Sequence, residues 1–198
     1  EREDVFSLSD VVLAFVPSRP ALDGQRLAEA AEHVGTPPAE LVLDLIAADG
    51  EKVVMVAFGM DHTDVYRVLS HPRAMLGSDG WVQATDASPQ PHPRNFSTTI
   101  RFLSRFVRDR PLIALGTAIR KMTSQPADRI GLADRGRLEV GAVADVTVLD
   151  YELMSDLATY ERPSVYPTGV EHGVVAGEPV IQSGHLTDAR PGSVLLDL

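Results

Sequence analysis

The spacing of apolar and polar residues predicts a strand followed by two helices in the first part of the chain. Residues 8–16 form a mostly apolar run of strand length. Apolar residues then recur at helical spacing over residues 25–34 and again from Pro37 to Gly50, and each run stops at a glycine. Pro37 suits the first helical position, where no backbone N–H is needed. We therefore expect an acidic helical pair over residues 21–50.

The next stretch has the pattern strand, helix, strand. Residues 53–58 are apolar almost throughout, which is typical of a parallel strand buried on both faces. A helical stretch over 63–69 and a short apolar run at 74–77 complete a predicted βαβ unit. Asp79 follows directly in a Ser-Asp-Gly sequence, and α/β folds place their chemistry at such strand ends. A strand-end aspartate can equally be a turn former that bonds its own backbone.

Residues 81–95 predict a long irregular loop. They contain three of the chain's 14 prolines and a His-Pro-Arg sequence, and long loops of this kind are often functional. Helices are expected over residues 97–108 and 112–122, followed by a short helical turn that begins at 124 and ends at Gly131.

The remainder of the chain has a β-like pattern. Residues 145–150 alternate, while 170–175 and 180–183 flank an Ala-Gly-Glu turn and predict a hairpin. Residues 132–198 are therefore expected to form a small separate β layer.

Composition restricts the classes of partner. The 18 Lys and Arg residues stand against 28 Asp and Glu, a net charge of −10, which argues against a nucleic-acid partner. We expect a solvated helix face from the basic residues Arg101, Arg105, Arg108, Arg110, Arg120 and Lys121. The apolar runs are far shorter than the roughly 20 residues of a membrane helix, so no membrane partner is expected. No targeting segment is recognised, and the cytoplasm is the default location.

A complete metal site is not recognisable in the sequence. There is no cysteine, and the six histidines include no His-x-His pair and no helical His-x-x-x-His. We therefore assign no metal ligand to this chain. The lack of cysteine also excludes disulfides and thiol nucleophiles.

One stretch near the middle of the chain has a specific pattern. It contains Thr-Ser-Gln-Pro-Ala at 123–127, Gly-Leu-Ala-Asp-Arg-Gly-Arg-Leu-Glu-Val-Gly at 131–141 and Ala-Asp-Val at 144–146. In this order these elements resemble the tail of the amidohydrolase superfamily, in which the last barrel helix leads into a β-sandwich strand. Asp145 opens that strand, and we interpret it as a structural hydrogen-bonding residue rather than a catalyst.

Within that superfamily the chain is most similar to the D-aminoacylases, the N-acyl-D-amino-acid deacylases. The similarity covers nearly the whole chain and rests on Met-Leu-Gly-Ser-Asp-Gly at 75–80, Pro-His-Pro-Arg at 91–94, Phe-Leu-Ser-Arg-Phe-Val-Arg at 102–108, Ala-Ile-Arg-Lys-Met-Thr-Ser at 118–124, Tyr-Pro-Thr-Gly at 166–169 and Ala-Arg-Pro-Gly at 189–192.

The resemblance implies an α/β fold, namely the C-terminal part of a TIM-barrel amidohydrolase plus strands of a small β-sandwich. Residues 1–50 would be a helical insertion near the barrel mouth, 51–131 the last barrel strands and helices, and 132–198 the C-terminal part of the β-sandwich. A complete barrel takes about 250 residues. The N-terminal part of the same protein is therefore the expected missing partner.

The resemblance also implies roles for three residues. Asp79 would be catalytic, passing a proton from a metal-bound water to the departing amine nitrogen. Arg94 would hold the substrate carboxylate, because a guanidinium can bind a carboxylate bidentately. His92 is a further substrate-binding candidate that could instead only fix the loop. Zinc is the implied cofactor, with all its ligands outside this chain.

The implied enzyme is a hydrolase acting on linear amide bonds, which converts N-acyl-D-amino acids to a carboxylate and a D-amino acid. We expect the isolated chain to be inactive. One alternative is a cyclic amidohydrolase of the dihydroorotase or dihydropyrimidinase kind, against which the His-Pro-Arg loop argues. Another is a non-catalytic fragment acting as an interaction module, because a two-strand remnant would expose apolar sheet edges.

Overall fold

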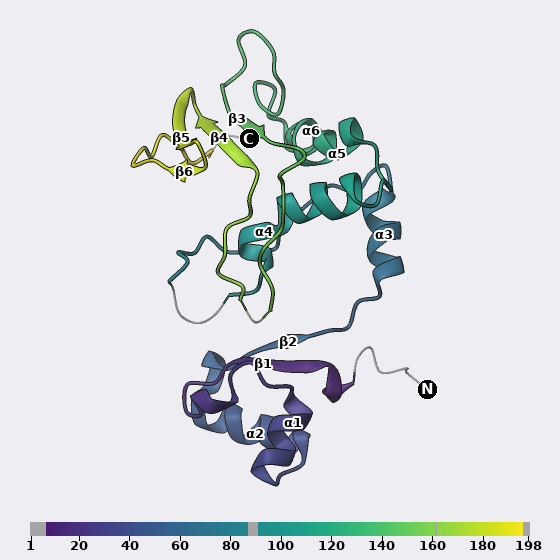
Figure 1. Ribbon diagram of the computed structural model, residues 1–198, viewed down its shortest axis with the longest axis vertical. Helices are drawn as coiled ribbons and strands as arrows, with labels where there is room; N and C mark the ends of the chain where they lie inside the picture. The colour runs from purple at the N-terminus through teal and green to yellow at the C-terminus, as the bar shows by residue number, and fades with distance from the viewer. Residues whose placement is uncertain (1–6, 87–90, 161, 196–198) are drawn as a thin grey trace.

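The first part of the chain folds around a two-stranded antiparallel sheet. The computed structural model describes residues 7–86, 91–160 and 162–195. Strand β1 (Val11–Phe15) pairs with β2 (Val54–Ala57), and α1 (Leu27–Val34) and α2 (Pro38–Asp49) lie beside them (Figure 1). The strand and both helices predicted for this region are confirmed.

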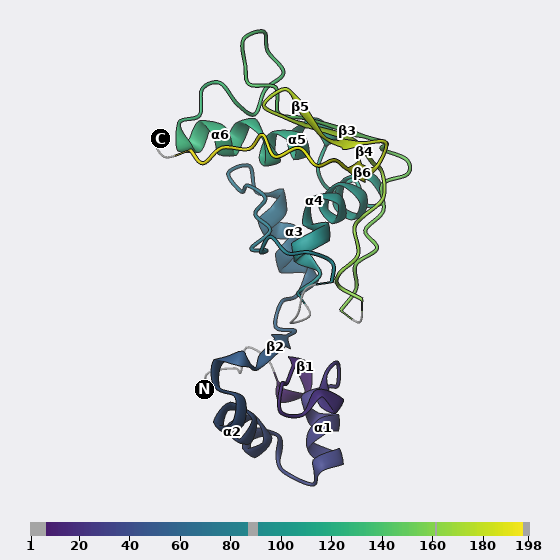
Figure 2. The ribbon, with the colours of Figure 1, turned by 90° about the vertical axis from the view of Figure 1, so that its left-hand side faces the viewer.

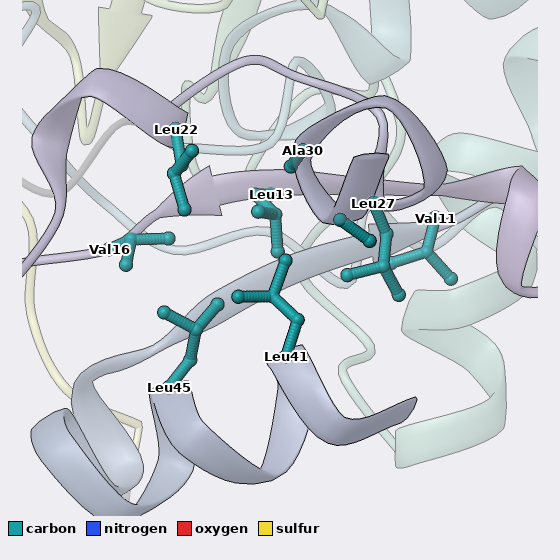
Figure 3. Packing of buried hydrophobic residues seen from close by; sticks show 9 residues of the cluster. Val11, Leu13, Val16, Leu22, Leu27, Ala30, Leu41 and Leu45 are labelled. Atoms are coloured by element: carbon teal, nitrogen blue, oxygen red, sulfur yellow. The ribbon is translucent and has the colours of Figure 1, made fainter. Parts of the chain in front are cut away.

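Leucine side chains from three elements form the core of this lobe. Leu13 of β1, Leu27 of α1 and Leu41 and Leu45 of α2 are all fully buried. Figure 3 shows Leu13 pointing toward Leu41. Full burial of a leucine is worth about 1.5–3 kcal/mol, so these few side chains hold the strand and the helices together.

β2 and the segment after it differ from the predicted parallel unit. β2 pairs antiparallel with β1, and α3 (His62–Ser70) follows it as expected, but residues 74–77 join neither described sheet. The Leu76 N–H donates to the Lys121 carbonyl at 3.2 Å instead. The prediction of a second strand at 74–77 is wrong because the following helices, rather than a neighbouring strand, supply the partners of this backbone.

The second lobe is built on helices that follow the long loop (Figure 2). Its helical elements are α4 (Arg94–Arg101), a π-helical continuation over Phe102–Arg108, α5 (Leu115–Met122) and α6 (Ser124–Ile130). The first helix begins before its predicted start at 97, and residues 87–90 of the predicted loop lie outside the described residues. Over the described parts of the chain, no helix is both long and apolar enough to cross a membrane.

A four-stranded antiparallel sheet closes the described chain. Its strands run in the order β3 (Val146–Leu149), β4 (Val170–Val175), β5 (Glu178–Gln182) and β6 (His185–Leu186). The predicted hairpin is confirmed as β4 and β5. The fold is thus α/β with two small antiparallel sheets, and residues 196–198 of the predicted β layer lie outside the described residues.

Gly169, just before β4, provides a test of this packing. A Cβ there would lie 2.6 Å from the Met154 backbone, and φ is +82°. We expect Gly169→Ala to lose about 1 kcal/mol from backbone strain and a further ~1–3 kcal/mol from the overlap. Gly177→Ala is the matched control, because φ is +84° with no atom within 4 Å of the new Cβ. Denaturant unfolding of the two variants measures the difference, and equal losses would contradict the packing argument.

Candidate functional site

The structure brings Asp79 and Arg94 into contact. Arg94 Nη2 lies 3.0 Å from Asp79 Oδ2, with the two side chains 40% and 86% exposed. Arg94 is the first residue of α4, and Asp79 follows the segment that packs on α5. An exposed ion pair contributes about 0–1 kcal/mol, so each partner remains available to another charged group.

The Asp79 turn is held against the start of α4. The Gly80 N–H donates to Ser78 Oγ at 3.1 Å, so Ser78 supplies the side-chain bond that stabilises the turn. Asp79 itself has φ of +50°, a conformation uncommon outside glycine. A Cβ at Gly80 would lie 3.1 Å from the Asn95 Cα. Glycine at this position therefore allows the turn to approach α4 closely and presents the Asp79 carboxylate to Arg94.

His92 supports the backbone of Arg94. Its Nδ1 accepts a hydrogen bond from the Arg94 N–H at 3.0 Å. Burial lowers the pKa of His92, the positive charges of Arg94 and Arg101 lower it further, and Asp79 opposes them. The imidazole is therefore held in the neutral form, which leaves Nδ1 free to accept. This geometry favours the loop-fixing interpretation of His92.

Tyr160 is an additional residue at the site that the sequence did not indicate. Its ring packs edge-on against His92 at 5.2 Å between centroids and against Phe58 at 4.6 Å. It thereby joins the end of β2 to the loop before α4. Nothing local in the sequence signals this contact, because Tyr160 lies in the stretch predicted as the β layer.

A cavity of about 510 Å³ opens beside Arg94. Its apolar wall comes from β1 and β2, and its polar groups come from the loop and the start of α4; the lining residues are Ala14, Val54, Met55, Val56, Ala57, Trp81, Val82, Gln83, Pro91, His92, Arg94 and Asn95. This combination of an apolar wall with a few convergent polar groups is typical of a small-molecule site. A second cavity of about 680 Å³, between α4, α5 and the C-terminal sheet, is lined by none of the three predicted site residues.

The described residues do not form a metal site. Within residues 7–86, 91–160 and 162–195, no group of three or more His, Cys, Asp or Glu side chains is placed to hold an ion. His71 has a structural role, since its Nδ1 accepts from the Arg73 N–H at 3.2 Å. The residues that the structure describes therefore do not by themselves fit a bound zinc.

Asp145 is structural in its geometry, in line with the sequence interpretation. Its carboxylate accepts hydrogen bonds from the Arg135 guanidinium and, at 2.8 Å, from the Ala176 N–H. It thereby ties the start of β3 to the turn between β4 and β5.

Several basic residues of the second lobe bond to protein groups, and the expectation of a solvated face is wrong for Arg101, Arg108 and Lys121, whereas Arg105 stays 55% exposed. Arg101 and Arg105 contact Asp156 at 2.5 Å and 3.1 Å, and the Asp156 side chain is 1% exposed. Arg108 donates to three backbone carbonyls in residues 151–154. Lys121 is buried. Residues 151–158 cover the helix face of Arg101 and Arg108, and residues 71–74 cover Lys121.

Comparison with known proteins gives a family match and several related enzymes. A model described as the amidohydrolase family matches residues 9–181. N-acyl-D-glutamate deacylase of Alcaligenes xylosoxydans xylosoxydans is 38% identical over 195 residues, which are 98% of this chain and 38% of that protein. The D-aminoacylase of the same organism is 34% identical over the same shares. The chain thus spans 38% of the length of these curated relatives.

Solved structures agree with this match. A D-aminoacylase crystal structure superposes with a TM-score of 0.80 at 32% identity, covering 90% of this chain and 36% of that one. N-acyl-D-glutamate deacylase from Bordetella bronchiseptica gives a TM-score of 0.77 at 32% identity, over 87% of this chain and 34% of that one. That structure contains zinc and a phosphonate inhibitor that mimics the tetrahedral intermediate of the reaction.

Proposed function

Because the chain belongs to the amidohydrolase family, we propose that it forms the C-terminal part of an enzyme that hydrolyses N-acyl-D-amino acids to a carboxylate and a D-amino acid. The observation that supports this most is the contact between Asp79 and Arg94 beside a 510 Å³ cavity. The site thus pairs a proton acceptor with a cation suited to a carboxylate. The deacylase names of the similar proteins point to the same substrate class.

Arg94 is the proposed binding group for the α-carboxylate of the substrate. Its guanidinium lines the cavity, and its Nε is buried with no hydrogen-bond partner in the part of the chain that the structure describes. The side chain as a whole is 40% exposed, so the outer part of the guanidinium is accessible to an incoming carboxylate. The planar guanidinium offers two parallel N–H groups for such a partner.

Asp79 is the proposed proton carrier. Its carboxylate would take a proton from the attacking water and deliver it to the amide nitrogen as the C–N bond breaks, so that the amine leaves neutral. Arg94 beside it would keep the substrate carboxylate, and with it the α-amino nitrogen, within reach. Both functions use side chains on the same short stretch of surface.

The rest of the catalytic machinery is proposed to lie in the N-terminal part of the same protein. Zinc is present in the Bordetella relative, whereas the described residues of this chain offer no group to hold it. We assign the zinc ligands to that N-terminal part and the proton carrier and carboxylate-binding group to this chain. The 198 residues alone are then expected to be inactive.

The test is an assay of the full-length protein on three substrates. N-acetyl-D-glutamate, its L-enantiomer and a cyclic ureide such as dihydrouracil separate the proposed activity from a cyclic amidohydrolase. We expect turnover of the D-compound alone. Hydrolysis of the cyclic compound with none of the acyclic one would replace the proposal by the cyclic alternative.

Arg94→Met tests the carboxylate-binding role. Loss of a charge-assisted hydrogen bond costs about 1.5–3 kcal/mol, so we expect KM for the acyl amino acid to rise by ~10–100-fold with a smaller change in kcat. Arg67→Met is the control, because Arg67 is exposed and pairs with the equally exposed Asp64 on its own helix. An unchanged KM in Arg94→Met would show that the substrate carboxylate binds elsewhere.

A further inference from the structure

We propose that Lys121 of α5 is the positioning residue for Asp79. The inference rests on the proposed function, since it assigns Lys121 a role in the reaction that Asp79 would perform. The segment before Asp79 belongs to no described sheet, so its position is not fixed by pairing with a strand. Lys121 would fix it instead. This role was not predicted from the sequence, because Lys121 was expected on a solvated helix face.

The Lys121 ammonium is enclosed by backbone carbonyls of the segment that leads to Asp79. The residue is 2% exposed. Its Nζ donates to the His71 carbonyl at 2.5 Å and to the Ala74 carbonyl at 2.9 Å. Burial lowers the pKa of Lys121, with a smaller effect from the neighbouring Arg120. A charged group is buried at this cost only where it is well hydrogen-bonded, and here both carbonyl acceptors lie in one short stretch of chain.

Further bonds from the same helices hold this stretch. The Leu76 N–H donates to the backbone carbonyl of Lys121 at 3.2 Å. Gln125 Nε2 lies 3.2 Å from the Pro72 carbonyl and 3.3 Å from the Ala74 carbonyl. Residues 71–76 are thus fixed by α5 and α6 instead of by a strand ladder. Lys121 contributes the only cation among these bonds.

The position of Asp79 follows from this arrangement. The carboxylate lies shortly after Leu76 in the chain, on a turn that packs against the start of α4. Gly80 and the contact with Arg94 fix the Asp79 turn against α4. Lys121 fixes the preceding segment against α5. If the ammonium is removed, the His71 and Ala74 carbonyls lose their charged donor and the segment relaxes. A displacement of about 1 Å in a catalytic group can cost ~10²-fold in rate.

The first experiment is the kinetics of Lys121→Met in the full-length enzyme. With N-acetyl-D-glutamate we expect kcat per folded enzyme to fall by about 10–100-fold while KM stays within about 3-fold, because binding by Arg94 is retained. Lys121→Arg should recover part of kcat, since a guanidinium can still donate to the two carbonyls. Arg120→Met, which removes the adjacent exposed charge, is the matched control and should leave kcat unchanged.

A double-mutant comparison separates positioning from general destabilisation. If Lys121 acts through Asp79, Lys121→Met should cause no further loss of the residual rate in an Asp79→Asn enzyme. An equal fold-loss in both backgrounds would overturn the proposal. Should Lys121→Met fail to fold, Gln125→Leu replaces it, because this change removes neutral donors to the Pro72 and Ala74 carbonyls of the same segment.

Amide hydrogen exchange of the 198-residue chain tests the same idea without turnover. The Leu76 and Gly80 amides should exchange faster in Lys121→Met than in Arg120→Met, because the segment before Asp79 is released. If the full-length enzyme does not act on N-acyl-D-amino acids, the proposed function fails, and exchange still decides the role of Lys121. Unchanged exchange at both amides would overturn the inference whatever the substrate.

Discussion

Replacement of Asp79 by alanine is expected to lower kcat for N-acyl-D-amino acids by about 10²–10⁴-fold in the full-length enzyme, the usual contribution of a positioned acid–base group. The variant has no group at this place to take the proton from water or to return it to nitrogen. Arg94 would keep its guanidinium in the cavity, so substrate binding should be retained. Steady-state kinetics together with zinc analysis measures the outcome.

Two comparisons make this result specific. Zinc content should not change, because the zinc ligands are proposed to lie in the N-terminal part of the protein. Asp64→Ala removes another exposed carboxylate that also pairs with an arginine, and it should leave kcat unchanged. Normal turnover by Asp79→Ala would remove this residue from the mechanism and leave the Asp79–Arg94 pair as a structural contact.

The elements that the sequence predicted correctly are those with local signals. α1 and α2 combine helical apolar spacing with a glycine at the end, where Gly35 adopts the left-handed conformation. The hairpin of β4 and β5 likewise follows from two short β-forming runs around a tight turn. In each case the residues that determine the element are neighbours in the chain, so the pattern is sufficient.

The partners of β2 and of residues 74–77 could not be predicted in this way. An apolar run shows that a segment is buried, but it does not say which distant segment supplies its hydrogen bonds. β2 pairs with β1, which precedes it in the chain. The backbone of residues 74–77 instead bonds to groups of α5 and α6. The parallel unit was predicted because it pairs apolar runs that are neighbours in the chain. In the structure, contacts with more distant segments determine the pairing.

The candidate site shows the same division. Asp79 and Arg94 were found because both lie in short motifs that resemble a known family, and a strand-end carboxylate already suggested chemistry. Their mutual contact, and the contact of Tyr160 with His92, join segments far apart in the chain. Lys121 was missed because a lysine on an amphipathic helix indicates a solvent-facing position unless the covering segment is known.

Asp156→Ala is expected to destabilise the second lobe more than the loss of an exposed ion pair would. The Asp156 carboxylate is 1% exposed and contacts Arg101 and Arg105. Loss of hydrogen bonds to a buried charged group typically costs about 1.5–3 kcal/mol, and the remaining arginines, 30% and 55% exposed, stay in contact with water. Asp109→Ala is the matched control, since it removes a half-exposed carboxylate that pairs with Arg108 and should cost about 0–1 kcal/mol.

The consequence of this change should extend to the site. Arg101 also donates to the Ala158 carbonyl at 3.0 Å, so the Asp156 cluster holds the segment that carries Tyr160 against His92. Urea unfolding measures the loss of stability, and NMR shifts of the His92 ring report whether Tyr160 has moved. Equal stabilities of the two variants would show that the cluster contributes no more than a surface pair. A destabilised Asp156→Ala chain with unchanged His92 shifts would show that the cluster stabilises the lobe without positioning the site.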